Sequence, residues 1–252
     1  MSLIELDSAT TGYGKSRAVE EVSFTIEQGE VLCVIGPNGA GKTTLIRAVS
    51  GSLPLWSGRL AFAGRDITGL GPEERAVCGV GLCPEGRRIL SSLTVRENLL
   101  IGATALQRRC RGREGRRLVG EAFERVHELF PWLAARAAAS GGTLSGGQQQ
   151  MLAIARALMS NPALLLLDEP SLGLAPRIID DVYALLAKLR GGGLTMIVVE
   201  EGTSHALNFA DKAMVMHGGR VFLQGTVAAI RDDPRVAVPY LGEEAIIAGA
   251  PR

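Results

Sequence analysis

A glycine-rich segment between a predicted strand and a predicted helix constrains this chain more than any other feature. Residues 36–43 read GPNGAGKT and match the pattern G-x-x-x-x-G-K-[ST]. The apolar run Glu30 to Ile35 predicts a strand before it, and Thr43 to Ser50 predicts a helix after it. This order turns backbone N–H groups and the positive end of a helix dipole toward one point. The segment is therefore predicted to bind phosphate groups.

The residues of this loop have distinct predicted roles toward ATP and Mg²⁺. Lys42, one of only four lysines in the chain, is expected to reach the β- and γ-phosphates, and the Thr43 hydroxyl to ligate magnesium. A chance match is the alternative, because the chain has 32 glycines, but the strand–loop–helix context disfavours it. The predicted nucleotide-binding residues of the loop are Gly36, Pro37, Asn38, Gly39, Ala40, Gly41, Lys42, Thr43 and Thr44.

A second motif ends another apolar run. Ala163 to Leu167 is continuously apolar, which is typical of a parallel strand buried on both faces, and Asp168 and Glu169 follow it. Carboxylates at the C-terminal end of such a strand point into the crevice beside the phosphate loop. We expect Asp168 to hold magnesium and Glu169 to act as the general base that orients the attacking water. An acidic pair on the surface is the disfavoured alternative.

Residues 144–148 read LSGGQ, and this third motif discriminates between families of phosphate-loop proteins. The three motifs together resemble the ABC-type ATPases, and the resemblance extends from Leu3 to Gly242. It implies that two ATPase domains meet head to tail, so that each ATP lies between one phosphate loop and the other domain's signature. The signature residues acting in trans would be Leu144, Ser145, Gly146, Gly147 and Gln148.

Several further stretches resemble the ATPases of branched-chain amino-acid importers, among them residues 84–88 (PEGRR) and 171–176 (SLGLAP). By the same resemblance Tyr13 would stack on adenine, although an exposed tyrosine at a strand end is the plainer alternative. The resemblance also implies that a cytoplasmic helix of a membrane permease docks beside Glu85 to Arg88.

Three positions depart from the superfamily pattern. Glu85 replaces the glutamine of the loop that joins the two lobes, where it would contribute to the metal site and to catalysis. Ala175 replaces an aspartate, and Glu201 replaces the histidine after the next strand. An ionised glutamate cannot donate a hydrogen bond to the γ-phosphate. At ~4 Å it would repel a phosphate charge by roughly 4 kcal/mol, unless Glu201 points away, is protonated or faces a cation.

The pattern of elements predicts an α/β fold. We expect a phosphate-loop NTPase core of the ABC type with a parallel central sheet, an N-terminal antiparallel β subdomain and an inserted α-helical subdomain at about residues 90–160. The whole chain, residues 1–252, is expected to be a single ABC ATPase domain. The other predicted strands are Ser2 to Asp7, Val22 to Ile26, Leu194 to Val199 and Ala213 to Met216, the last turning at Gly218-Gly219 into Val221 to Leu223.

Composition limits the remaining possibilities. With 27 basic and 26 acidic residues the net charge is +1, which argues against a nucleic-acid partner. Six arginines between Arg108 and Arg117 are interpreted as a solvated helix end rather than an anion-binding patch. The four cysteines have no metal-ligand spacing and are expected to be reduced. The chain has neither a secretory signal nor an apolar run of ~20 residues, so a cytoplasmic location is expected.

The resemblance implies an Mg-dependent ATPase subunit that drives uptake of branched-chain or related amino acids from the inner face of the cell membrane. Its partners would be two permease subunits, a second identical or paralogous ATPase subunit and an extracytoplasmic substrate-binding protein. One alternative is the same ATPase role for another solute, such as urea, short amides or an exported lipid. The other is a regulatory module that binds ATP and turns over poorly, which Glu85 and Glu201 together would favour.

Overall fold

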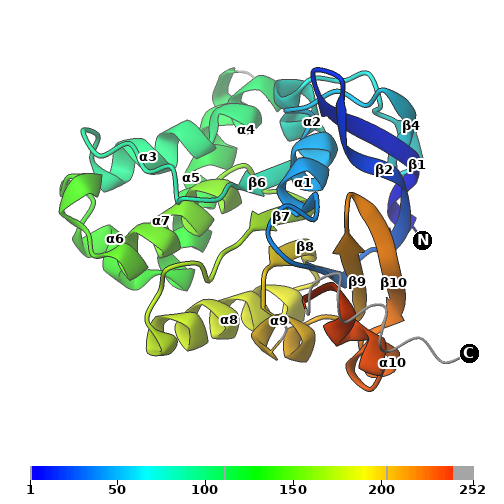
Figure 1. Ribbon diagram of the computed structural model, residues 1–252. Helices are drawn as coiled ribbons and strands as arrows, with labels where there is room; N and C mark the ends of the chain where they lie inside the picture. Colours follow the sequence, from blue (N-terminus) through cyan, green and yellow to red (C-terminus); the bar gives the residue numbers. More distant parts are fainter. Residues whose placement is uncertain (1, 111, 203, 241–252) are drawn as a thin grey trace, which may run out of the picture.

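The computed structural model describes residues 2–110, 112–202 and 204–240. Two sheets and a lobe of helices make up this part of the chain (Figure 1). Leu241 and Gly242, the last residues of the family resemblance, lie outside the described residues, as does Arg111 of the arginine cluster.

The N-terminal sheet has four strands in the order β2-β1-β4-β5 and is antiparallel throughout. Its strands are β1 (Ser2–Tyr13), β2 (Ser16–Glu27), β4 (Ser57–Phe62) and β5 (Arg65–Asp66). β1 is twice as long, and β2 more than twice as long, as the alternation of apolar and polar residues predicted. β4 and β5 were missed, because β4 opens on the polar residues Ser57, Gly58 and Arg59 and β5 has only two residues.

The central sheet has six strands in the order β10-β9-β3-β8-β7-β6. Its strands are β3 (Val31–Ile35), β6 (Val80–Cys83), β7 (Leu164–Asp168), β8 (Thr195–Glu200), β9 (Lys212–His217) and β10 (Arg220–Thr226). Every neighbouring pair is parallel except β9 and β10, which form the predicted antiparallel hairpin. The predicted parallel sheet is thus confirmed, with β6 as a short edge strand that the sequence did not reveal.

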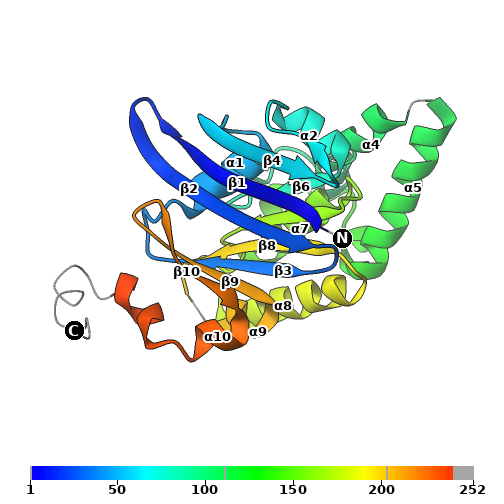
Figure 2. The same cartoon turned by 90° about the vertical axis from the view of Figure 1, so that its right-hand side faces the viewer.

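The two faces of the central sheet contact different layers (Figure 2). Alternate residues of β3 divide accordingly: Leu32 and Val34 pack toward the N-terminal sheet and α1 (Lys42–Ser50), while Cys33 and Ile35 pack toward the helices on the other side. Both faces of β3 are buried, as its continuous apolar sequence requires.

Five helices of the predicted helical lobe lie between β6 and β7 in the chain. They are α3 (Val95–Gly102), α4 (Thr104–Arg109), α5 (Gly112–Leu129), α6 (Pro131–Ala135) and α7 (Gly146–Leu158), with the short 3₁₀ turn η1 (Gly141–Thr143) before α7. They lie on the side of the molecule away from β10 (Figure 1). The remaining helical segments are α2 (Pro72–Cys78), α8 (Pro176–Gly191), α9 (Ser204–Phe209), α10 (Val227–Arg231) and η2 (Pro234–Tyr240).

The arginine cluster forms exposed ion pairs in the described part of the chain. Arg117 pairs with Glu114 and Glu121 on α5, and Arg108 of α4 pairs with Glu73 of α2. This agrees with the interpretation as a solvated helix end. Among the helices that the structure describes, none is long and apolar enough to cross a membrane.

Candidate active site

The phosphate loop passes close to other backbone segments at two of its glycines. A Cβ atom at Gly36 would lie 2.4 Å from the carbonyl oxygen of Met216, and one at Gly41 would lie 2.3 Å from that of Ala18. Gly41 also has φ 99°, a conformation that L side chains rarely adopt. The loop therefore lies tightly between β2 and the end of β9, and positions 36 and 41 have no room for a side chain.

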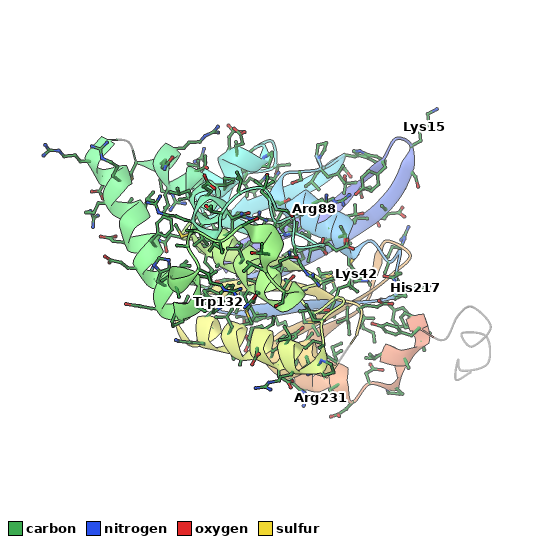
Figure 3. All side chains as sticks on the ribbon, turned by 90° about the vertical axis from the view of Figure 1, so that its left-hand side faces the viewer. Lys15, Lys42, Arg88, Trp132, His217 and Arg231 are labelled. Carbon is green, nitrogen blue, oxygen red and sulfur yellow. The ribbon has the colours of Figure 1, made fainter. Side chains whose placement is uncertain are left out.

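The start of α1 presents positive charge to the interior of the loop. Lys42 is 4% exposed, and its ammonium donates hydrogen bonds to the carbonyl oxygens of Gly36 at 2.8 Å and Pro37 at 3.1 Å. Gly41 caps the helix without a side-chain acceptor, and the first turn contains no acidic residue. The N–H groups of this turn and the ammonium thus form a site for an anion. Figure 3 labels Lys42 among the side chains drawn on the ribbon.

Asp168 and the phosphate loop meet, as predicted from their separate strands. The Thr43 hydroxyl donates a 3.0 Å hydrogen bond to Oδ1 of Asp168, the last residue of β7. Asp168 is 4% exposed. Burial raises its pKa to about 6, and the charges of Glu85 and Glu169 act in the same direction.

The residues around Asp168 fit a bound Mg²⁺. Thr43 and Asp168 supply two hard oxygen atoms, and a bound cation would offset the charges of Glu85 and Glu169 that act on Asp168. Within the described ranges, no group of three or more His, Cys, Asp and Glu side chains forms a metal cage. Such a cage is not required, because Mg²⁺ typically binds one or two protein oxygens together with waters and substrate phosphates.

Glu169 lies beside Lys42, with 3.7 Å between Oε1 and Nζ. Its side chain is 10% exposed, and its backbone is left-handed with φ 49°. Burial raises the pKa of its carboxyl, Lys42 opposes this shift, and the charges of Glu85 and Glu201 reinforce it. A largely buried carboxyl with a raised pKa beside a phosphate site has the properties of a general base.

Glu85 belongs to a loop that the signature helix holds in place. Arg87 and Arg88, which follow it, are both left-handed, with φ 65° and 47°. Arg156 of α7 donates hydrogen bonds to their carbonyl oxygens, at 3.0 Å to Arg87 and 2.7 Å to Arg88. The guanidinium of Arg87 in turn lies against Gly146, where a Cβ atom would be 2.9 Å from its Nη1.

The signature residues form a separate cluster on the helical lobe. Ser145 caps α7: its hydroxyl accepts from the Gln148 N–H at 3.3 Å, and its own N–H donates to Gln148 Oε1 at 3.1 Å. Ser145 is exposed, Leu144 is buried, and a Cβ atom at Gly147 would lie 2.7 Å from Ile178 of α8. The cluster thus presents a capped helix N-terminus at the surface.

Glu201 and Tyr13 contact residues of the loop and of α1. Asn38 Nδ2 donates a 3.1 Å hydrogen bond to Glu201 Oε1, and Tyr240 donates to the Glu201 carbonyl at 3.1 Å. Glu201 therefore does not point away from the phosphate loop. Tyr13 is 47% exposed, and its hydroxyl accepts a 3.0 Å hydrogen bond from Arg47 of α1.

The sequence did not single out two residues that organise this site. Arg156 lies in a helix of apolar and polar residues and has no motif of its own. Glu200 is a carboxylate at the end of the β-branched run of β8 and is 5% exposed. A charged residue directly after an apolar strand was the available signal for Glu200, but such residues are usually exposed.

Residues 19–172 match the family model described as ABC transporter. The chain is an ABC transporter ATPase. It is 42% identical over 240 residues to the high-affinity branched-chain amino acid transport ATP-binding protein BraG of Pseudomonas aeruginosa, covering 95% of this chain and 100% of that protein. It is also 30% identical to the lipopolysaccharide export system ATP-binding protein LptB of Haemophilus influenzae, covering 97% and 99% of the two chains.

Solved structures agree with this assignment. A nucleotide-free ATP-binding cassette from an ABC transporter has a TM-score of 0.84 and 31% identity, and the match covers 96% of this chain and all of that one. A dimeric cassette bound to ADP and Pi has a TM-score of 0.74 and 26% identity, covering 89% and 98% of the two chains. This ABC ATPase therefore binds and hydrolyses nucleotide as a subunit of a transport system.

Proposed function

We propose that this ABC ATPase drives the uptake of branched-chain or related amino acids. The observation that carries the proposal is the 42% identity to BraG over 95% of this chain and all of that protein. Two stretches that resemble that group of importers lie at the site. Residues 84–88 form the loop that contains Glu85, and residues 171–176 form the turn after β7.

Within the site, we assign one task to each side chain. Lys42 binds the β- and γ-phosphates, Thr43 and Asp168 hold Mg²⁺, and Glu85, whose charge raises the pKa of Asp168, acts on the same ion. Mg²⁺ would neutralise charge that develops on the phosphates. Glu169 accepts a proton from the attacking water, and its raised pKa supports that role.

A second ATPase subunit completes the site in this proposal. Ser145 is exposed at the N-terminus of α7, so its hydroxyl and the helix dipole can face the γ-phosphate held by another subunit. The half-exposed ring of Tyr13 is available to adenine. The partner is an identical or a paralogous chain.

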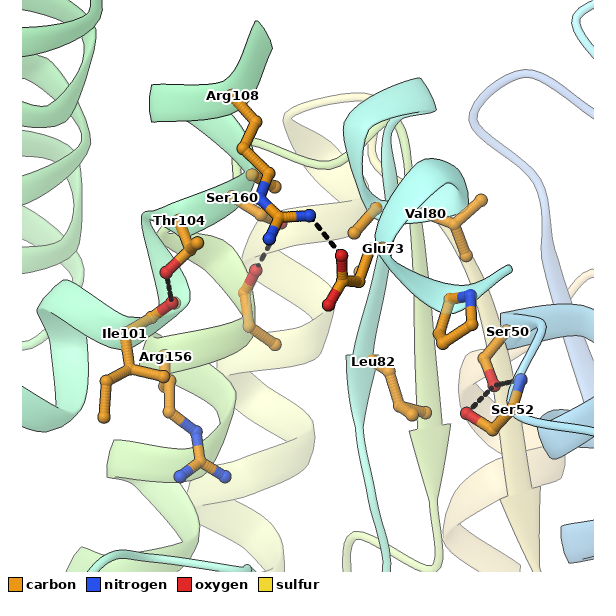
Figure 4. A pocket seen from close by; sticks show the side chains of 16 residues that line it. Ser50, Ser52, Glu73, Val80, Leu82, Ile101, Thr104, Arg108, Arg156 and Ser160 are labelled. Carbon is orange, nitrogen blue, oxygen red and sulfur yellow. Dashed lines mark hydrogen bonds and ion pairs between the residues drawn. The ribbon is translucent and has the colours of Figure 1, made fainter. Parts of the chain in front are cut away.

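A groove between the core and the helical lobe suits a permease segment (Figure 4). Its volume is about 300 Å³, and its walls come from α2, β6, α3, α4 and α7. Ile101 is 45% exposed at its edge, and Leu82 lines it. Arg156 also lines the groove, and it holds the carbonyl groups of the loop that follows Glu85. A permease segment bound in the groove would contact Arg156, which positions this loop.

The complete system in this proposal has two permease subunits and an extracytoplasmic substrate-binding protein. The ATPase, with residues 1–252 acting as a single domain, then lies on the cytoplasmic face of the cell membrane and is held there by the permease. No nucleic acid is involved.

Transport in proteoliposomes tests the proposed solute. The chain, its permease subunits and its binding protein are reconstituted with ATP inside, and uptake of labelled leucine, urea and a short amide is compared. Uptake of leucine at least about 10-fold above the other two is expected. Preference for urea or the amide would contradict the proposal and leave the ATPase assignment intact.

The alternative of a poorly hydrolysing regulatory module rests on Glu85 and Glu201 together, and the Glu201 carboxylate lies against the phosphate loop at Asn38. Phosphate release by the isolated chain and by the assembled transporter separates the two. A rate that stays near background in both preparations would favour the regulatory module. The export-protein relatives support a lipid solute only weakly, because their identities are 30% and 33% against 42% for BraG.

A further inference from the structure

Glu200 is a buried carboxylate that the proposed mechanism does not use. It is the last residue of β8 and is 5% exposed. Its Oε1 accepts hydrogen bonds from the Ser171 N–H at 3.1 Å and the Tyr183 hydroxyl at 3.0 Å. Its Oε2 accepts one from the Ser171 hydroxyl at 2.8 Å. Three donors from two other segments thus converge on one side chain.

Two of these donors belong to the turn that contains Glu169. The N–H of Glu169 donates a 2.9 Å hydrogen bond to the carbonyl oxygen of Val199, the residue before Glu200. Consecutive residues at the end of β8 therefore hold Glu169 and Ser171, with Pro170 between them. The turn is attached to β8 on both sides of the proline.

The backbone of Glu169 requires such attachment. A non-glycine residue at φ 49° is strained and keeps this conformation only when its surroundings impose it. The bond to Val199 fixes the nitrogen side of the residue, and the bonds from Ser171 to Glu200 fix the segment after it. Without the Glu200 carboxylate, Ser171 would lose both of its hydrogen bonds to β8, and the segment after Glu169 would be held by its own turn, in which the Leu172 N–H donates to the Glu169 carbonyl oxygen at 3.2 Å.

We propose that Glu200 is a positioning residue for hydrolysis: its carboxylate holds Ser171 and thereby keeps Glu169 aimed at the water that attacks the γ-phosphate. This inference rests on the proposed role of Glu169 as general base. Tyr183 of α8 supplies the third hydrogen bond and ties the same carboxylate to the helix that begins at the end of the turn.

The test compares Glu200→Ala and Glu200→Gln with a matched control on the same strand. Thr195 is fully buried at the other end of β8, where its hydroxyl accepts a 2.8 Å hydrogen bond from the Gly29 N–H. Thr195→Val removes a buried hydrogen bond of similar kind away from the turn. The measurements are kcat for phosphate release, the Kd for ATP and Tm.

Glu200→Ala is expected to lower kcat about 10- to 100-fold, because misplacing a reacting group by about 1 Å costs up to that much. The Kd for ATP should change less than about twofold, because Lys42 and the phosphate loop are untouched. Glu200→Gln should recover at least about a third of the wild-type kcat, since its amide oxygen still accepts from Ser171 and Tyr183. Thr195→Val should lower Tm and leave kcat near wild type.

A double variant shows whether Glu200 acts through Glu169. Adding Glu200→Ala to Glu169→Gln should reduce the residual rate less than twofold, because the group being positioned is already absent. The proposal would be overturned if the kcat losses of the two single variants multiplied in the double variant. It would also be overturned if Glu200→Gln had a kcat no higher than Glu200→Ala, or if Thr195→Val lowered kcat as much as Glu200→Ala. A wild-type chain without phosphate release would instead contradict the proposed roles at the site itself.

Discussion

Asn38 in the phosphate loop donates a 3.1 Å hydrogen bond to the carboxylate of Glu201, so this exposed glutamate faces the phosphate loop. Two consequences follow. A carboxylate stands where the family has a hydrogen-bond donor, and its charge raises the pKa of Glu169.

Glu201→Gln is expected to lower the Kd for ATP about 3- to 10-fold, because a repulsive charge is removed and a donor is gained. It should also lower the pKa of Glu169. A general base works when deprotonated, so the rise of kcat with increasing pH should move to lower pH. ATPase kinetics from pH 5 to 9 measure both effects. Glu121→Gln removes an equal charge from α5 as a control, and an equal response there would contradict the prediction.

Glu169→Gln should bind ATP and hydrolyse it at least about 100-fold more slowly, because the amide keeps the shape of the side chain and cannot accept the proton. The ATP-bound dimer should then accumulate. Gel filtration with Mg-ATP is expected to show a shift from monomer to dimer. Normal turnover in this variant would remove Glu169 from the mechanism.

Asp168→Asn should stabilise the nucleotide-free protein at neutral pH. The pKa of Asp168 is about 6 in the folded chain, against an ordinary value of 3.8. The folded chain therefore holds this proton more tightly than the unfolded chain. Its contribution to stability is most favourable below about pH 4 and is lost as the pH rises through 6.

Above pH 6, ionised Asp168 lowers the free energy of unfolding by roughly 2–3 kcal/mol. Asp168→Asn should therefore raise Tm by about 4–10 °C at pH 7.5. The rise in Tm of this variant over wild type should be smaller at pH 5. Its Mg-dependent phosphate release should fall at least about 100-fold. Thermal melts with and without Mg²⁺ at both pH values test this. A variant that is less stable at pH 7.5 would show that burial of Asp168 carries no such cost.

Arg87→Ala tests coupling between the loop after Glu85 and the signature. The Arg87 guanidinium lies against Gly146 and donates a 3.5 Å hydrogen bond to the Gly173 carbonyl oxygen. Its loss should lower permease-stimulated ATPase about fivefold or more and basal ATPase less than twofold, in line with coupling energies of about 1 kcal/mol. Arg113→Ala on α5 is the control, and equal losses in both rates would argue against coupling.

Ile101→Glu tests the groove of Figure 4 as the permease site. A charge at its apolar edge should weaken co-purification with the permease at least about 10-fold while basal ATPase stays unchanged. Phe222→Glu is the matched control, since Phe222 is 40% exposed on β10, at the opposite edge of the central sheet from β6. Unimpaired association of the Ile101 variant would exclude the groove.

Local sequence was sufficient where neighbours in the chain decide the structure. The phosphate loop, the strand before it and the helix after it follow from residues 30–50, and β7 with its terminal carboxylates follows from one apolar run. The turn at Gly218-Gly219 was likewise predicted from adjacent residues. β6 was not predicted, because its four residues include Gly81 and become a strand only by pairing with β7.

The sequence by itself determined the chemistry of this protein: a lysine and a threonine at a helix start, an aspartate and a glutamate at a strand end, and a serine at a capped helix. Only the tertiary structure decided how those groups act on one another. It brought Asp168 to Thr43 from 125 residues away, pointed Glu201 at Asn38, and gathered Ser171 and Tyr183 around Glu200. The physical reason is that hydrogen bonds and burial depend on distance in space, which strand order and helix packing set, and the residue types alone do not.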